Sequence, residues 1–132
     1  MLNWDNLSSV NIHRFDEDHQ QLFSIINGLH SAMAVGAGAT RVGQVMAELT
    51  THLPEHFSAE DALMEKTGYP ELAAHRLEHQ QLIAQFASLQ KEVAAGKFVS
   101  SVVVAEFLDK CLKHTRETDK KYSAHLNANG IF

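Results

Sequence analysis

Seven side chains of this sequence have the chemistry and the spacing of a metal-binding set. They are His19, His56, Glu60, His75, His79, His114 and Asp119. They fall into four groups, one in each of four stretches with helical periodicity, and the local spacings are H-x3-E, H-x3-H and H-x4-D. Imidazole suits iron, zinc and copper, whereas carboxylate suits harder ions. Five imidazoles and two carboxylates that meet in one bundle therefore predict a site for two metal ions.

The spacings indicate how each group can reach a common centre. Residues four apart on a helix share a face, so the H-x3-E and H-x3-H pairs can each point to one site. His114 and Asp119 are five apart, which in an α-helix turns one side chain about 140° from the other. We therefore expect these two to approach the site from different sides. Glu60 and Asp119 are the expected bridges, because a carboxylate has two oxygens and an imidazole binds one ion. The set then describes a dinuclear site with one open coordination position.

A more ordinary interpretation competes with this one. A single His or Glu on a helix is usually a surface residue, or a core residue whose polar atoms are satisfied. Seven such residues at one end of a bundle are not independent accidents, so we favour the metal site. The remaining histidines are assigned to no metal: His13, His30, His52 and His125.

The elements that must hold these residues are four amphipathic helices. We expect an irregular arm over residues 1–15, then helices over about 16–35, 41–66, 70–95 and 100–127, with short glycine-containing loops between them. Short connections imply an all-α, antiparallel up-down-up-down four-helix bundle over residues 16–127. The ligand groups lie near the starts of the first and third helices and near the ends of the second and fourth. Alternating helix direction therefore brings them to one end of the bundle.

Several local features refine this expectation. Thr40 can cap the second helix, and Pro70 can open the third. Pro54 cannot donate a backbone hydrogen bond, so we expect a kink or bulge just before His56. Val103 is expected on the inward face of the fourth helix. Three apolar residues can hold the arm on the bundle: Trp4, Val10 and Ile12.

Composition limits the class of protein. The chain has 132 residues, 45% of them hydrophobic, which suffices for one domain with a core. It has no apolar run long enough to cross a bilayer and no secretory signal, so we expect a cytoplasmic protein without membrane insertion. Its one cysteine, Cys111, excludes an internal disulfide. The formal net charge of -5 and the lack of a basic stripe argue against nucleic acid as a partner.

The chain resembles the hemerythrin family, and more closely its single-domain bacteriohemerythrins. The segments that carry the resemblance are DEDHQQLFSIINGLH around His19, HFSAEDALM from His56, HRLEHQQL from His75 and HTRETDKKY from His114. All seven ligand positions are filled, and the match covers nearly the whole chain. Residues 1–132 are therefore interpreted as a single hemerythrin-like domain.

The resemblance implies an oxygen-binding di-iron centre bridged by hydroxide or oxide. One iron would be held by His75, His79 and His114, the other, which keeps an open position, by His19 and His56, and both by Glu60 and Asp119. The family's function is reversible O2 binding, for storage, delivery or sensing, and NO and other small anions are further candidate ligands. The alternative is a di-iron redox enzyme that handles NO or peroxide at a centre that autoxidises quickly.

Three residues around His114 depart from the family pattern. Where bacteriohemerythrins commonly have Trp, Leu and Ile, this chain has Lys110, Cys111 and Thr115. In the family that Leu and that Ile help to wall the O2 pocket, so Cys111 and Thr115 predict a more polar pocket with smaller walls. We expect water to enter more readily and to speed autoxidation, unless another side chain refills the space. A redox-active thiol at Cys111 is less favoured, because a lone buried Cys is more often a small hydrophobe.

Overall fold

A computed structural model describes residues 9–95 and 100–132 of the chain. Its four long helices are α1 (His13–Ala34), α2 (Gly38–Lys66), α3 (Leu72–Ala94) and α4 (Ser101–Lys113). α4 continues directly into a π-helical turn (His114–Thr118), a 3₁₀ turn (Asp119–Tyr122) and the short α5 (Ser123–Ala128). The predicted contact of Trp4 with the bundle lies outside the described residues.

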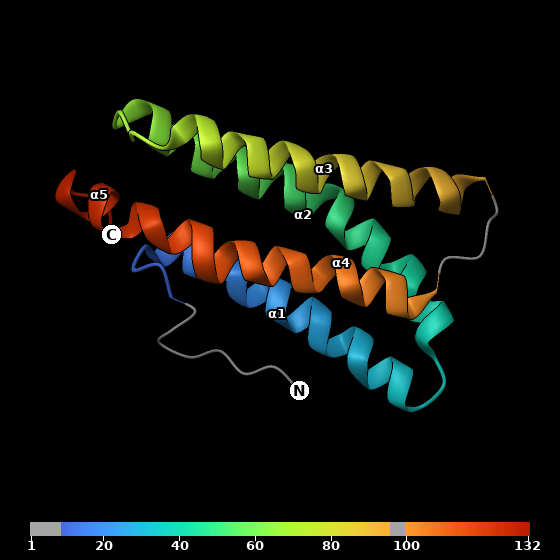
Figure 1. The fold of residues 1–132 in the computed structure, drawn as a ribbon. Helices are drawn as coiled ribbons and strands as arrows, with labels where there is room; N and C mark the ends of the chain where they lie inside the picture. The colour runs from blue at the N-terminus through green and yellow to red at the C-terminus, as the bar shows by residue number, and fades with distance from the viewer. Residues whose placement is uncertain (1–8, 96–99) are drawn as a thin grey trace.

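The long helices form an antiparallel four-helix bundle, as the sequence predicted (Figure 1). α1 packs on α2, α2 packs on α3, and α4 closes the bundle against α1 and α3. The turn between α2 and α3 lies at the same end as α5, and the α1–α2 connection lies at the other end. Among the described residues, no helix combines the length and the hydropathy that a membrane crossing requires.

The first two helices begin earlier than expected. α1 begins three residues before Asp16, because the Asp16 N–H already donates to the Ile12 carbonyl at 2.8 Å. α2 likewise begins two residues before Thr40, and the Arg41 N–H donates to the Ala37 carbonyl at 3.1 Å. The prediction that Thr40 caps α2 is therefore wrong, since helical bonding starts before this residue.

Pro70 lies outside the helix that it was predicted to open. α3 begins two residues after Pro70, because the chain first makes a turn in which the Leu72 N–H donates to the Tyr69 carbonyl at 3.2 Å. α2 stays α-helical through Pro54, so no bulge interrupts it, and the alternative, a kink, stays a prediction. Pro54 is exposed, and the carbonyl that it leaves unbonded can face water.

The last helical segment departs most from the prediction. It was expected to be one continuous helix, but α4 ends at Lys113 and a π-helical turn and a 3₁₀ turn follow it. It begins as expected, because the Ser100 hydroxyl accepts a hydrogen bond from the Val103 N–H at 3.2 Å and caps α4. Val103 itself is 43% exposed, whereas Val104 is fully buried, so the prediction that Val103 faces the core is wrong. The inward face instead follows Val104, Leu108 and Cys111, which turns Val103 about 100° away.

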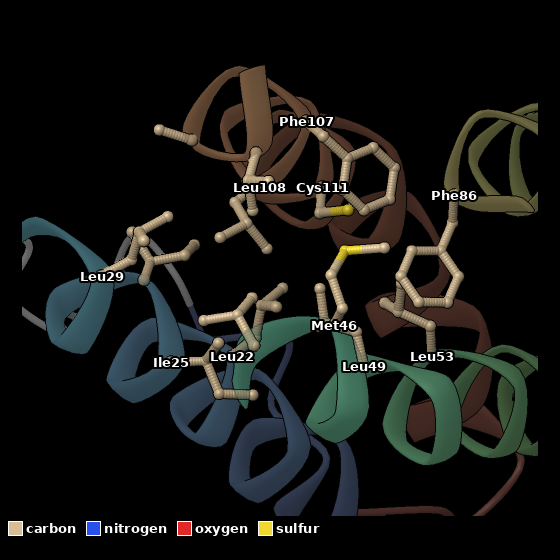
Figure 2. Close-up of a cluster of buried hydrophobic side chains, with 14 of the residues drawn as sticks. Leu22, Ile25, Leu29, Met46, Leu49, Leu53, Phe86, Phe107, Leu108 and Cys111 are labelled. Carbon is tan, nitrogen blue, oxygen red and sulfur yellow. The ribbon is translucent and has the colours of Figure 1, made fainter. Parts of the chain in front are cut away.

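Two clusters of buried apolar side chains form the core. The larger cluster joins all four long helices, and its members include Leu22, Ile25, Leu29, Met46, Leu49, Leu53, Phe86, Phe107, Leu108 and Cys111 (Figure 2). The smaller one, here called the end cluster, consists of Val10, Ile12, Phe15, Met64, Tyr69, Tyr122 and Leu126. Val10 and Ile12 thus hold the segment before α1 on the bundle, as predicted. Along each long helical segment, the predicted ligands fall between residues of the two clusters.

Candidate metal centre

The structure brings all seven predicted ligand side chains together in the bundle interior. Each is at most 5% exposed. They come from every long helical segment: His19 from α1, His56 and Glu60 from α2, His75 and His79 from α3, and His114 and Asp119 from the turns after α4. Antiparallel packing therefore produces the convergence at one level of the bundle that the sequence predicted.

Asp119 lies between imidazoles of different helices. Its Oδ1 is 2.8 Å from Nε2 of His75 and 2.9 Å from Nε2 of His114. Its Oδ2 is 3.2 Å from Nε2 of His19 on the opposite side. The two oxygens of this one carboxylate thus face two different sets of imidazoles.

Glu60 has a similar intermediate position. Its Oε1 is 3.2 Å from Nε2 of His56 and 3.3 Å from Nε2 of His79. Its Oε2 accepts a hydrogen bond from the buried hydroxyl of Tyr122. Tyr122 also stacks on His75, with ring centroids 5.6 Å apart, so the end cluster contacts the centre directly.

The donor atoms form two overlapping groups, and within each group they all lie within 4.8 Å of one another. One group consists of Glu60, His75, His79, His114 and Asp119, and the other of His19, His56, Glu60 and Asp119. Both carboxylates belong to both groups, whereas the imidazoles divide into three and two. This arrangement can hold two cations that share the carboxylates.

The π-helical turn explains how His114 and Asp119 reach the same centre. The Asp119 N–H donates to the His114 carbonyl, a bond across five residues that widens the turn by one residue. His114 Nε2 and Asp119 Oδ1 are consequently only 2.9 Å apart. The expectation that these side chains approach from different sides is therefore wrong, because it assumed α-helical geometry throughout.

Three partly exposed carboxylates support the imidazoles from outside. The contacts are His56 Nδ1 to Asp18 Oδ2 at 2.8 Å, His79 Nδ1 to Asp61 Oδ1 at 2.9 Å, and His114 Nδ1 to Glu78 Oε1 at 3.3 Å. Such contacts leave Nε2 of each ring to face the centre and fix the ring orientation. For His19 and His75, Nδ1 has no hydrogen-bond partner among the described residues.

These supporting carboxylates were missed in the sequence, although they have a recognisable signal. Asp18 precedes His19, Asp61 follows Glu60, and Glu78 precedes His79, so each adjoins a ligand of its own helix. Each bonds an imidazole of the next helical segment rather than its own.

The electrostatics of the centre favour ionised carboxylates. Burial and Asp119 raise the pKa of Glu60, but the neighbouring imidazoles of His56 and His79 lower it by more, to about 2. Burial also opposes ionisation of Asp119, yet the adjacent imidazoles of His114, His19 and His75 hold its pKa well below the usual range. Both carboxylates are therefore anionic at neutral pH and suited to bind cations.

The imidazoles respond in the opposite direction. Burial lowers the pKa of His56, but Glu60 and Asp18 raise it more, to about 10. Burial likewise lowers the pKa of His114, while its contact with Asp119 and the charge of Glu60 raise it to about 9. In the metal-free protein these rings hold protons that an incoming cation must displace.

The donor atoms are better arranged to bind cations than to form hydrogen bonds with one another. Among the described residues, Nε2 of His75, His79 and His114 and both oxygens of Asp119 lie close to one another but form no hydrogen bond, although they are buried. Buried polar atoms without partners are rare and call for an explanation such as an ion. Two divalent cations would supply partners for these atoms and would offset the charge of the two carboxylates.

The two residues predicted to wall an O2 pocket are both buried. The Thr115 hydroxyl donates to the Cys111 carbonyl at 3.2 Å, so its hydrogen is directed to the backbone. Cys111 lies in the larger apolar cluster, and burial together with Asp119 raises its thiol pKa to about 12. A protonated thiol in apolar surroundings behaves as a small hydrophobe, while the role of both residues in an O2 pocket stays a prediction.

None of the four histidines left unassigned belongs to either donor group. His13 and His30 are exposed, and Nε2 of His125 is 3.0 Å from the Thr67 carbonyl. His52 stacks on His56 with ring centroids 5.8 Å apart, so it packs against the centre without facing it.

Comparisons with known proteins show which proteins this chain is similar to. Residues 10–126 match the profile described as the hemerythrin HHE cation binding domain. A bacteriohemerythrin of Methylococcus capsulatus is 32% identical over 120 residues, which cover 90% of this chain and 91% of the relative. One of Stenotrophomonas maltophilia is 30% identical over 131 residues, covering 96% and 85%. A crystal structure of wild-type hemerythrin superposes with a TM-score of 0.83 at 30% identity, covering 96% of this chain and 98% of that one.

Proposed function

Because the chain belongs to the hemerythrin HHE cation-binding domain family, we propose that its buried centre holds two iron ions and binds O2 reversibly. The observation that carries the proposal is the division of five imidazoles into three and two around two shared carboxylates. In this assignment His75, His79 and His114 would hold one ion, His19 and His56 would hold the other, and Glu60 and Asp119 would contribute to both. The ion with fewer imidazoles would be the one available to O2.

When bound, iron supplies the electrons that O2 accepts on binding and takes them back on release. The donor set suits this role, since a shell rich in neutral imidazole puts less negative charge on iron than a shell of carboxylates. Less anionic charge favours the lower iron valence, and hence reversible binding over oxidative chemistry. Storage, delivery and sensing are all compatible with such a centre.

The protein's own contribution is orientation, proton placement and exclusion of water. Asp18, Asp61 and Glu78 fix three imidazoles through Nδ1. Tyr122 stays protonated, because burial and the nearby carboxylates raise its pKa well above the usual range, and its hydroxyl orients Glu60. The two apolar clusters on either side keep bulk water from the centre.

The experiment that tests the proposal is an anaerobic titration followed by visible spectroscopy. The protein is loaded with iron, reduced without air, exposed to O2 and then degassed, and iron is counted per chain. We expect two irons per chain and an O2-dependent charge-transfer band that persists in air and disappears on degassing. If the iron-loaded protein is folded and shows no such band, reversible O2 binding is refuted.

The same experiment separates the alternative. Immediate conversion to a stable di-ferric spectrum, followed by turnover of peroxide or NO, would support a redox enzyme instead. The residues that favour this alternative are Cys111 and Thr115, which replace larger apolar side chains of the family pattern.

A further inference from the structure

Three cavities on the surface of the bundle each reach one imidazole of the centre. The cavity between α1 and α2 reaches His56, the one between α3 and α4 reaches His114, and the one between α2 and α3 reaches His79. The third is lined mainly by apolar side chains, whereas the first two have polar linings and similar volumes, about 230 and 270 Å³. The two polar cavities are therefore the candidate routes for a hydrated cation.

The two polar cavities differ in charge. The α1–α2 cavity is lined by three carboxylates and one guanidinium, from Asp18, Glu48, Glu55 and Arg14. Arg41 contacts Glu48 from outside this lining, at 3.5 Å, so the unscreened negative charge is that of Asp18 and Glu55. The α3–α4 cavity is lined by two carboxylates and two ammonium groups, from Glu78, Glu117, Lys110 and Lys113. A divalent cation is therefore attracted more strongly to the α1–α2 cavity.

The carboxylate nearest to the centre also differs between the two cavities. In the α1–α2 cavity, Asp18 contacts Nδ1 of His56 through Oδ2 at 2.8 Å, and its Oδ1 forms no hydrogen bond among the described residues. In the α3–α4 cavity, both oxygens of Glu78 accept from the Thr118 hydroxyl, and Oε1 also lies 3.3 Å from Nδ1 of His114. Asp18 thus keeps an oxygen available for a cation, whereas the oxygens of Glu78 already have partners.

Only the ring of His56 separates the α1–α2 cavity from the donor atoms. Its Nδ1 faces Asp18 in the cavity, and its Nε2 lies 3.2 Å from Oε1 of Glu60 in the centre. His52 lines the same cavity, stacks on His56 and has no hydrogen-bond partner in the part of the chain that the structure describes. The cavity therefore offers both carboxylate oxygen and imidazole nitrogen, and together these suit first-row divalent metals.

We propose that divalent cations reach the centre through the α1–α2 cavity, where Asp18 and Glu55 attract them, and pass to the donor atoms when the His56 ring swings aside. They would arrive first at the donor group that has only two imidazoles, because His56 belongs to that group. This inference rests on the proposed function only in treating the seven donors as metal ligands.

The test follows the rate at which cobalt(II), supplied alone to the metal-free protein, is taken up, measured by stopped-flow visible absorption. Glu55 and Glu117 are exposed carboxylates without an ion pair among the described residues, one in each polar cavity. Glu55→Gln should slow uptake about threefold to tenfold at low salt, as the loss of one charge a few ångströms from a divalent ion in water implies, and the difference should vanish at about 1 M salt. Glu117→Gln, the matched control, should leave the rate unchanged, and both variants should still bind two cobalt ions.

A second pair of variants fills each cavity without a change of charge. Thr51 and Gln81 are exposed residues that line the α1–α2 and the α3–α4 cavity, respectively. Thr51→Trp should slow uptake at both salt concentrations, by at least the factor seen for Glu55→Gln, and Gln81→Trp should not slow it. Wild-type rates in Glu55→Gln and Thr51→Trp, or equal slowing by Gln81→Trp, would overturn the proposal. Uptake of cobalt by a protein that forms no O2-dependent band with iron would refute the proposed function and leave this test standing.

Discussion

Replacing Tyr122 by Phe removes one hydroxyl at the point where the end cluster meets the centre. The ring is fully buried, packs 5.8 Å from Phe15 and stacks on His75, and these contacts survive in the variant. What is lost is the hydrogen bond to Glu60, whose side chain is also fully buried. A hydrogen bond to a charged group contributes about 1.5–3 kcal/mol, and Glu60 Oε2 would be left without its donor.

We therefore expect the free energy of unfolding of the metal-free variant to fall by about 2 kcal/mol, which lowers the Tm by about 8 °C in a domain of this size. In the iron-loaded protein the loss should be smaller, below about 1 kcal/mol, because cations at the shared carboxylate replace the donor. Urea unfolding of both forms without air measures the two values.

Tyr69→Phe is the control for this experiment. Its hydroxyl donates to the exposed Glu71 at 3.1 Å, so its loss should cost about 0.5 kcal/mol or less. Equal losses in Tyr122→Phe and Tyr69→Phe would refute the reasoning about the buried carboxylate. A loss in the iron-loaded Tyr122→Phe protein as large as in the metal-free one would refute the placement of a cation at Glu60.

Three further outcomes are expected. Cys111→Leu with Thr115→Ile should lengthen the lifetime of the oxygenated form, followed by its absorbance in air, and unchanged lifetimes would remove the argument for a polar pocket. The Cys111 thiol, with its pKa raised to about 12, should not react with Ellman's reagent at pH 8 until guanidinium unfolds the chain; reaction in the native state would contradict its burial. Asp18→Ala should weaken iron binding about 10- to 100-fold in a chelator competition, because His56 loses its partner, whereas exposed Glu17→Ala should have no effect.

The positions of the ligands in regular helices could be predicted, because a spacing of four residues has one meaning in an α-helix. His75 and His79 show this: the pair faces the centre as its spacing indicates. The H-x4-D pair could not be placed correctly, because the segment that unites it is a π-helical turn, in which a spacing of five residues does not have its α-helical meaning. The predicted start of α2 was also wrong. Thr40 is a residue type that often caps a helix, but here the Arg41 N–H already donates to the Ala37 carbonyl, so the helix begins before Thr40.

The supporting carboxylates mark another limit of sequence reasoning. An acidic residue next to a ligand has no obvious partner until the packing of the helices is known. Asp61, for example, bonds His79 only because α2 and α3 run side by side in opposite directions. The sequence pattern therefore identified the residues that face the centre. The supporting carboxylates that hold their imidazoles in place could be identified only from the contacts between helices.

The end cluster has a consequence for how fast metal enters and leaves. Its residues come from the segment before α1 and the first turn of α1, from α2, from the α2–α3 turn and from the region around α5. The Ser123 hydroxyl and the Asn127 amide further tie this region to the carbonyls of Val10 and Asn11. These ties close the route to the centre from that end, so we expect an ion to enter there only when the tied segments separate by partial unfolding.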